Sequence, residues 1–181
     1  MRKGCCLLGL VFLFAVAASA QETPRADVFL GYSYMRLNPG SASGFPSFNA
    51  NGGSGSFAYN INRTFGVVGD FGGYHSGSFG GGNLYTYLFG PRISYRGNNR
   101  FTPFAQVLFG GIHDGSGLLS QTASSNAFAL SAGGGVDLKA SDHWGIRLGQ
   151  VEYLMSRFDT TGTGRTTQNN LRVSTGVVFH W

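Results

Sequence analysis

The sequence predicts an all-β fold, an eight-stranded antiparallel up-and-down transmembrane β-barrel. Three observations predict it: alternating apolar runs, breaks that are short and long in turn, and an unusual composition. The chain contains 30 glycines, 16 phenylalanines and 8 tyrosines, and only 12% of its residues are charged. After residue 21 there is no apolar run long enough for a membrane helix, whereas runs of about ten alternating residues recur between glycine- and asparagine-rich breaks. This pattern is typical of strands with one lipid-facing side and one polar side.

The first 20 residues predict a cleaved secretory signal peptide. A basic start, MRK, precedes the apolar core CCLLGLVFLFAVA, and ASA supplies small residues before Gln21. A membrane anchor is disfavoured because the uncharged stretch lies at the lower length limit for a spanning helix. Cys5 and Cys6 both precede the cleavage point, so the mature chain has no cysteine. We therefore expect one domain, residues 21–181, without disulfides.

The charge of the chain gives little support to a nucleic-acid partner. The formal net charge is +5, and cleavage would remove Arg2 and Lys3. The remaining basic residues are arginines and the single Lys139, and they are spread along the chain rather than clustered. A nucleic-acid-binding domain typically gathers its basic residues on one face.

The first four runs place aromatic and aliphatic residues on one face and small or charged residues on the other. Such a period of two predicts a half-buried strand. In order, the apolar faces are Val28, Leu30, Tyr32 and Tyr34 in run 27–37; Phe57, Tyr59 and Ile61 in run 53–61; Phe65, Val67 and Phe71 in run 64–74; and Tyr85, Tyr87, Phe89, Ile93 and Tyr95 in run 83–95.

The fifth, sixth and eighth runs follow the same rule. Their apolar faces are Pro103, Ala105, Val107 and Phe109 in run 101–111; Phe128, Leu130, Val136 and Leu138 in run 127–138; and Leu171, Val173, Thr175, Val177, Phe179 and Trp181 in run 171–181. The seventh run, 144–158, changes phase after Leu148. One extra residue near Gly149 and Gln150 would restore the phase, so we expect a β-bulge there.

The breaks between the runs alternate in length. Those at 62–63, 96–99 and 139–143 are short, whereas the segments around 38–53, 74–83, 113–126 and 159–169 are longer and rich in Gly, Ser, Thr and Asn. Eight antiparallel strands joined in this way form a barrel with tight turns at one rim and longer loops at the other. Both ends of the barrel domain then lie at the rim with the tight turns.

Several stretches resemble the small eight-stranded outer-membrane barrels, the OmpA-like and OmpX-like group of the opacity-protein and "outer membrane protein beta-barrel domain" families. They are GYSY at 31–34, FGVVGDFGG at 65–73, YLFGPRISY at 87–95 with the following TPFAQVLFGG, and the closing VSTGVVFHW. The resemblance implies an integral protein of a Gram-negative outer membrane with both termini in the periplasm. It also implies contact with outer-membrane lipid and lipopolysaccharide. In these families the last strand is the signal read by the barrel-insertion machinery, which here implies Val177, Phe179 and Trp181.

Six charged residues fall on inward faces, three basic and three acidic. One hypothesis is a buried ion-pair network that fills the lumen, because buried charges persist only when they are paired. The other is an ion- or proton-conducting path, which charged residues also mark in membranes. An eight-stranded barrel is just wide enough to be filled by side chains, which favours the network. The six residues are Asp70, Arg92, Asp137, Arg147, Glu152 and Arg172.

The sequence offers no convincing catalytic, metal or cofactor site. No Ser–His–acid spacing is evident, and neither His75 nor His113 has a second ligand at regular spacing. The glycine-rich stretches at 80–83 and 131–136 are not followed by a predicted helix, so neither forms a phosphate loop. We therefore expect no enzyme, cofactor or metal.

The favoured hypothesis is a barrel with a filled lumen that acts through envelope structure and surface-exposed loops, in adhesion or recognition of an extracellular ligand. The alternative is a narrow porin-like channel for ions or small solutes. A lipid A-modifying enzyme is a third hypothesis, and it is the least favoured.

Overall fold

The computed structural model describes residues 24–38, 46–77, 82–98, 100–115, 125–160 and 164–181. The expected signal peptide, 1–20, lies outside these residues, so the boundary at Gln21 stays a prediction. The eight strands are β1 (Ala26–Leu37), β2 (Phe48–Asn60), β3 (Phe65–Ser76), β4 (Gly82–Ser94), β5 (Phe101–Asp114), β6 (Ser125–Lys139), β7 (Trp144–Thr160) and β8 (Gly164–His180).

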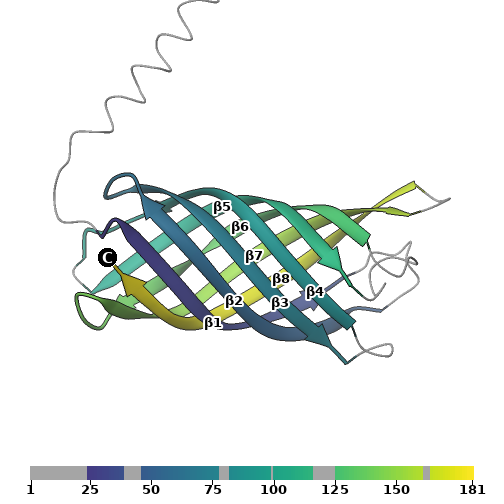
Figure 1. Cartoon of the computed structure of the whole chain (residues 1–181), viewed down its shortest axis with the longest axis horizontal. Coiled ribbons are helices and arrows are strands. Elements are labelled where there is room, and N and C mark those ends of the chain that lie inside the picture. The colour runs from purple at the N-terminus through teal and green to yellow at the C-terminus, as the bar shows by residue number, and fades with distance from the viewer. Residues whose placement is uncertain (1–23, 39–45, 78–81, 99, 116–124, 161–163) are drawn as a thin grey trace, which may run out of the picture.

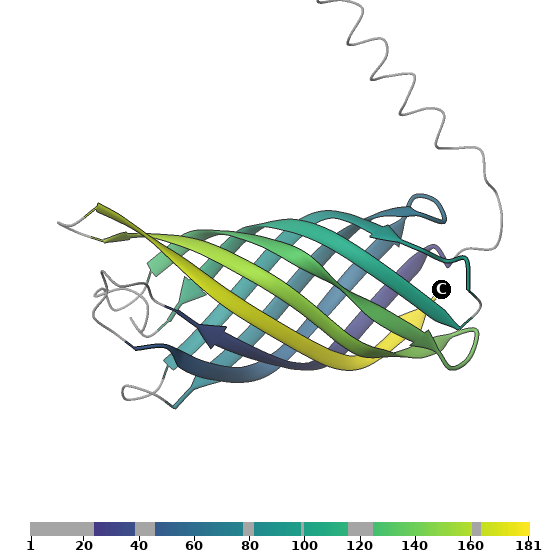
Figure 2. The ribbon, with the colours of Figure 1, turned by 180° about the vertical axis from the view of Figure 1, so that it is seen from behind.

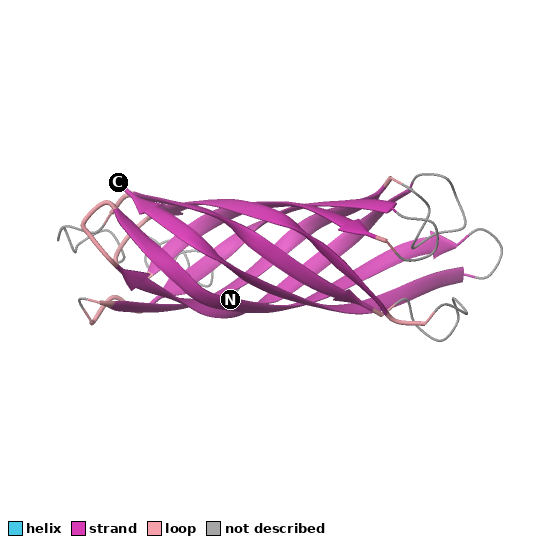
Figure 3. Cartoon of the chain, turned by 90° about the horizontal axis from the view of Figure 1, so that it is seen from below, coloured by secondary structure: helices cyan, strands magenta, loops and turns pink. Residues whose placement is uncertain are grey.

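The strands form a closed antiparallel barrel (Figure 1). Each strand pairs with the next along the chain, and β8 pairs with β1 from Asp27 opposite His180 to Arg36 opposite Leu171. Beyond the last paired strand residue, the backbone N–H groups of Ala26 and Trp181 donate to each other's carbonyl oxygens. The described residues consist of strands and their connections (Figure 3). The predicted fold class is therefore confirmed.

Among the described residues, no helix is long and apolar enough to cross a membrane.

The alternation of side chains separates an apolar outer face from a mixed interior. Neighbouring residues on β1 illustrate it, since Phe29 is 1% exposed and Leu30 is 57% exposed. Every strand contributes large apolar residues to the outer face, from Tyr32 on β1 to Phe179 on β8. A continuous apolar exterior is what a membrane requires of a barrel, because lipid cannot hydrate polar groups.

The predicted bulge is present on β7. The register with β8 shifts between Arg147 and Gln150, and the register with β6 shifts opposite the same segment. As a result, Leu148 and Val151 both face outward, although their positions have opposite parity. The extra residue keeps the apolar residues of both halves of β7 on the outer face.

Turns 61–64, 95–100 and 140–143 lie at one rim, here named the short-turn end, together with Ala26 and Trp181. In two of these turns, an asparagine side chain accepts a hydrogen bond from the backbone N–H group two residues later. Asn62 Oδ1 accepts from Thr64 N at 2.8 Å, and Asn98 Oδ1 accepts from Arg100 N at 2.8 Å. Short polar side chains favour tight turns in this way. The opposite rim is named the long-loop end. There the chain connects β1 to β2, β3 to β4, β5 to β6 and β7 to β8.

The prediction that the segments at 74–83 and 159–169 are longer than the tight turns is wrong. β3 continues to Ser76 and β4 begins at Gly82, so the connection 77–81 is shorter than the turn 95–100. β7 continues to Thr160 and β8 begins at Gly164, so this hairpin extends further than its neighbours at the long-loop end (Figure 2). Likewise, β2 begins at Phe48, five residues before the alternating run. The reason is physical: strands that extend past the membrane need no apolar face, so the alternation fades although backbone pairing continues. Threonine, frequent in 160–167, is itself a favourable strand residue.

Candidate functional site

The lumen is filled by an apolar cluster towards the long-loop end. Its residues come from six strands, and each is at most 7% exposed. All belong to one contiguous buried cluster. We name it the apolar plug, and it consists of Met35, Leu37, Phe48, Leu84, Ile112, Ala127 and Leu154.

Nearer the middle of the barrel, Arg172 on β8 binds two carboxylates. Its Nη1 donates to Asp70 Oδ1 at 2.6 Å and to the Tyr74 hydroxyl at 3.2 Å. Its Nε donates to Glu152 Oε2 at 2.7 Å, and its Nη2 forms an ion pair with the same carboxylate. Arg172 and Glu152 are directly opposite each other in the register of β7 and β8. Asp70 lies on β3, and its side chain reaches Arg172 across the lumen because the barrel wall is curved.

A second buried cluster surrounds Arg147. Its guanidinium donates to both oxygens of Asp137, at 2.7 and 3.0 Å, and to Gln150 Oε1 at 2.6 Å. The guanidinium carbon also lies 4.3 Å from the ring centre of Phe29 and 4.4 Å from that of Phe104. Such bidentate pairing and aromatic stacking suit the planar guanidinium.

The third inward arginine, Arg92, has no carboxylate partner among the described residues. Its Nε donates to Gln106 Oε1 at 2.9 Å, and its Nη2 is buried without a hydrogen-bond partner. Gln106 in turn donates to Glu152 Oε1 at 2.8 Å, which links the Arg92 and Arg172 clusters. Three arginines therefore meet three carboxylates unevenly: Arg172 takes two, Arg147 takes one, and Arg92 takes none.

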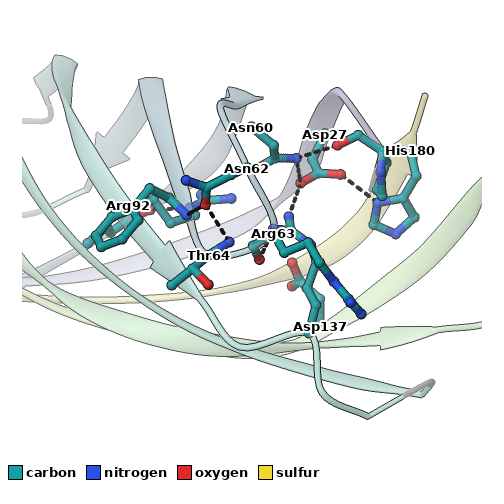
Figure 4. Close-up of polar contacts among 12 residues, drawn as sticks. Asp27, Asn60, Asn62, Arg63, Thr64, Arg92, Asp137 and His180 are labelled. Carbon is teal, nitrogen blue, oxygen red and sulfur yellow. Dashed lines mark hydrogen bonds and ion pairs between the residues drawn. The ribbon is translucent and has the colours of Figure 1, made fainter. Parts of the chain in front are cut away.

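A cavity of about 640 Å³ opens at the short-turn end and is bordered by Arg92 and Asp137. On its wall, Asp27 accepts hydrogen bonds from Asn60 Nδ2 at 2.9 Å and from Arg96 Nη2 at 3.0 Å. The His180 ring nitrogen Nδ1 lies 2.7 Å from the other Asp27 oxygen. Figure 4 shows Arg92 set apart from this Asp27 cluster.

The turn beside the cavity carries a surface ion pair. Lys139 Nζ lies 2.8 Å from Asp142 Oδ1. The hydrogen bond and the positive charge of Lys139 lower the pKa of the Asp142 carboxyl from its ordinary value. Asp142 is therefore ionised at neutral pH and is already matched by a cation.

The Asp27 cluster was missed as a site by sequence reasoning, although Asp27 and His180 occupy alternate positions to the apolar faces of runs 27–37 and 171–181. Barrel closure places the start of the first strand opposite the end of the last, and Asp27 is paired in register with His180. This closure is the signal that could have found the pair. Gln106 and Gln150 were also missed as partners of arginines, because only charged residues were considered on the inward faces and an amide is uncharged.

His75 and His113 each contact an asparagine. His75 Nδ1 lies 2.9 Å from Asn83 Oδ1, and His113 Nδ1 lies 2.9 Å from Asn126 Oδ1, each across a strand pair near the long-loop end. In the part of the chain that the structure describes, no three His, Cys, Asp or Glu residues are grouped as metal ligands.

The last strand presents Val177, Phe179 and Trp181 on the outer face. Trp181 is 65% exposed, and the ring centres of Phe179 and Trp181 are 6.4 Å apart. These side chains lie at the short-turn end beside β1. Their role in insertion stays a prediction.

Comparison with known proteins identifies the type of barrel. A family model described as "Outer membrane protein beta-barrel domain" matches residues 6–179. No curated protein sequence matches the chain.

Solved structures of three outer-membrane proteins share the fold. The chain is similar to Neisserial surface protein A (NspA), with 13% identity and a TM-score of 0.59 over 86% of this chain and 97% of that one. It is similar to Ail, the attachment invasion locus protein of Yersinia pestis, with 16% identity and a TM-score of 0.53 over 87% of this chain and 99% of Ail. It is also similar to OprG from Pseudomonas aeruginosa, with 10% identity and a TM-score of 0.52 over 90% of this chain and 99% of OprG. Identities this low show a common fold and carry no shared activity.

Proposed function

The chain belongs to the outer membrane protein beta-barrel domain family, and on that premise we propose a closed barrel that acts through its long-loop end. In this proposal the protein is an integral outer-membrane protein whose lumen conducts neither ions nor solutes. The long-loop end faces the exterior and recognises an extracellular ligand or surface. The short-turn end and both termini face the periplasm.

The burial of the lumen carries the proposal. Glu152 and Arg147 are 0% exposed and Arg172 is 1% exposed, although all three point into the barrel. A continuous column of water would expose these side chains and those of the apolar plug. In a barrel of this strand number, two arginines with their carboxylates and a layer of apolar residues leave little room for solvent. The channel hypothesis therefore has less support.

Conductance tests the closed lumen directly. Folded protein, identified by its heat-modifiable migration in gels, is reconstituted into planar bilayers beside an open porin as a positive control. We expect no regular conductance steps from the wild type. Regular, ion-selective steps from the wild type would overturn the closed-lumen proposal and favour the channel, with Arg92, Arg147 and Arg172 as the first residues to test for anion preference.

Cysteine labelling on whole cells tests the orientation. Gly77 lies at the long-loop end, and a Cβ added there meets nothing within 4 Å. Ala140 is exposed in the turn 140–143 at the short-turn end. We expect an impermeant thiol reagent to label Gly77→Cys on intact cells and Ala140→Cys only after the outer membrane is permeabilised. The reverse pattern would refute the proposed orientation.

The partners of His75, His113 and His180 give the enzyme hypothesis no support, because each ring nitrogen contacts an asparagine or Asp27 and no group of three metal ligands occurs among the described residues. His180 is matched by Asp27, and His75 and His113 face asparagines. Lipid and lipopolysaccharide remain the expected surroundings of the apolar outer face. Recognition of the last strand by the insertion machinery also belongs to the proposal.

A further inference from the structure

We propose that the cavity at the short-turn end binds a small solute carrying a carboxylate or phosphate group, and that Arg92 is the cation that anchors it. The proposal concerns the rim opposite the long loops and does not depend on what the loops recognise. It rests on the state of Arg92, on the charges around the cavity and on the size of the cavity.

Among the residues that the structure describes, Arg92 is a buried cation without a paired carboxylate. It is 2% exposed, and its guanidinium donates to the neutral amide of Gln106. Its Nη2 has no partner. Buried charges are normally paired, and buried polar atoms without partners are few in native proteins. Arg147, which resembles Arg92 in burial and stacking on Phe104, has Asp137 on two of its nitrogens. Among the described residues, Arg92 therefore lacks the carboxylate partner that Arg147 has.

The three aspartate carboxylates around the cavity are each paired with a cation other than Arg92. Asp27 is held by Arg96, Asn60 and His180. Both oxygens of Asp137 accept from Arg147. Asp142 pairs with Lys139 at the exposed turn. Because each acid has its own cation, an entering anion meets Arg92 without an unmatched carboxylate to repel it.

The cavity has the size and composition of a small-molecule site. Its volume of about 640 Å³ falls within the typical range of roughly 300–1,000 Å³ for ligand pockets. Its wall combines Arg63, Arg92, Arg96 and Lys139 with the hydroxyls of Ser94 and Thr102. A planar guanidinium presents paired donors that match the oxygens of a carboxylate or a phosphate. An oxyanion would thus supply the charge that Arg92 lacks.

Calorimetric titration of the purified, folded barrel in a phosphate-free maltoside detergent tests the proposal. The probes are succinate and inorganic phosphate, each added at constant ionic strength. We expect at least one of them to bind the wild type with saturation, and Arg92→Gln to weaken that binding roughly tenfold or more, since a charged hydrogen bond is lost. Arg100→Gln is the matched control, because Arg100 is exposed at the same end but does not border the cavity. It should bind as the wild type does.

A second variant keeps the test decisive if Arg92→Gln does not fold. Ser94 borders the cavity two residues from Arg92 on the same face of β4. Ser94→Asp would place a carboxylate beside Arg92 and should also abolish anion binding while the barrel folds. Absence of saturable binding to the wild type overturns the proposal. So does binding that is as tight in Arg92→Gln or in folded Ser94→Asp as in the wild type.

Discussion

Replacing Arg172 by glutamine should destabilise the barrel far more than replacing its partner Glu152 by glutamine. Arg172→Gln removes the one cation that serves two buried carboxylates, Asp70 and Glu152. These two acids would then face each other in the lumen without a counter-ion. Glu152→Gln, in contrast, leaves the Arg172 ion pair with Asp70 in place, and the new amide oxygen can still accept a hydrogen bond from Arg172 or from Gln106.

The magnitudes follow from these two geometries. Removing one partner of a buried pair typically costs about 3–5 kcal/mol, and we place Arg172→Gln at the upper end because two acids lose their cation. Weakening the hydrogen bonds of Glu152 while keeping an acceptor should cost about 1–2 kcal/mol. With a urea dependence of about 2 kcal/mol per molar, the midpoint should fall by about 2.5 M for Arg172→Gln and by about 0.5–1 M for Glu152→Gln.

The assay is urea unfolding in lipid vesicles, followed by tryptophan fluorescence and by heat-modifiable migration. The double variant should be less harmful than the sum of the single changes, because removing Glu152 relieves one of the two acids that Arg172→Gln leaves unpaired. A coupling of about 1–3 kcal/mol is expected for residues in direct contact. The exposed Arg100→Gln serves as the control. Additive effects, or equal costs for the two single changes, would refute this account of the cluster.

Two further predictions concern assembly and packing. Replacing both Phe179 and Trp181 by serine should leave export across the inner membrane intact but reduce the amount of heat-modifiable barrel in the outer membrane. Normal levels of folded barrel there would contradict the insertion-signal proposal. Gly110→Ala should destabilise the barrel by about 1–3 kcal/mol in the same urea assay, because its Cβ would overlap the Tyr87 carbonyl oxygen. Gly73→Ala should be nearly neutral, since its Cβ would lie 3.7 Å from Tyr85, and equal effects of the two changes would count against the packing argument.

The barrel wall could be predicted from the sequence because a membrane imposes a strict period of two. Leu30 and Phe29 differ in exposure as their parity requires, and even the change of phase at Gly149 correctly indicated the bulge. The period of two no longer identifies a strand where the outer face needs no contact with lipid. The polar residues of 164–170 pair in β8 with β7, yet they carry no apolar face from which a strand could be recognised.

The inward direction of the charged residues could also be predicted, whereas their distribution among partners could not. Parity places Arg92, Arg147 and Arg172 in the lumen, and Glu152 lies opposite Arg172 as neighbouring strands require. The contact between Arg172 and Asp70 crosses the lumen from β8 to β3. Such a contact depends on barrel curvature and side-chain length, and neither is visible in a pattern along one strand.

The uneven pairing of the three arginines corresponds to their positions relative to the cavity, because all three are at most 2% exposed. Desolvation makes an unpaired buried charge costly. Arg172 pairs with two acids, and Arg147, which stacks on Phe29 and Phe104, pairs with one. Arg92 borders the open cavity at the short-turn end and has none. A charge beside the cavity can be compensated by water or by an anion entering from outside, whereas Arg147 and Arg172 do not border the cavity and are paired by the chain itself. The inward arginine without a carboxylate partner among the described residues, Arg92, is therefore the one that borders the cavity.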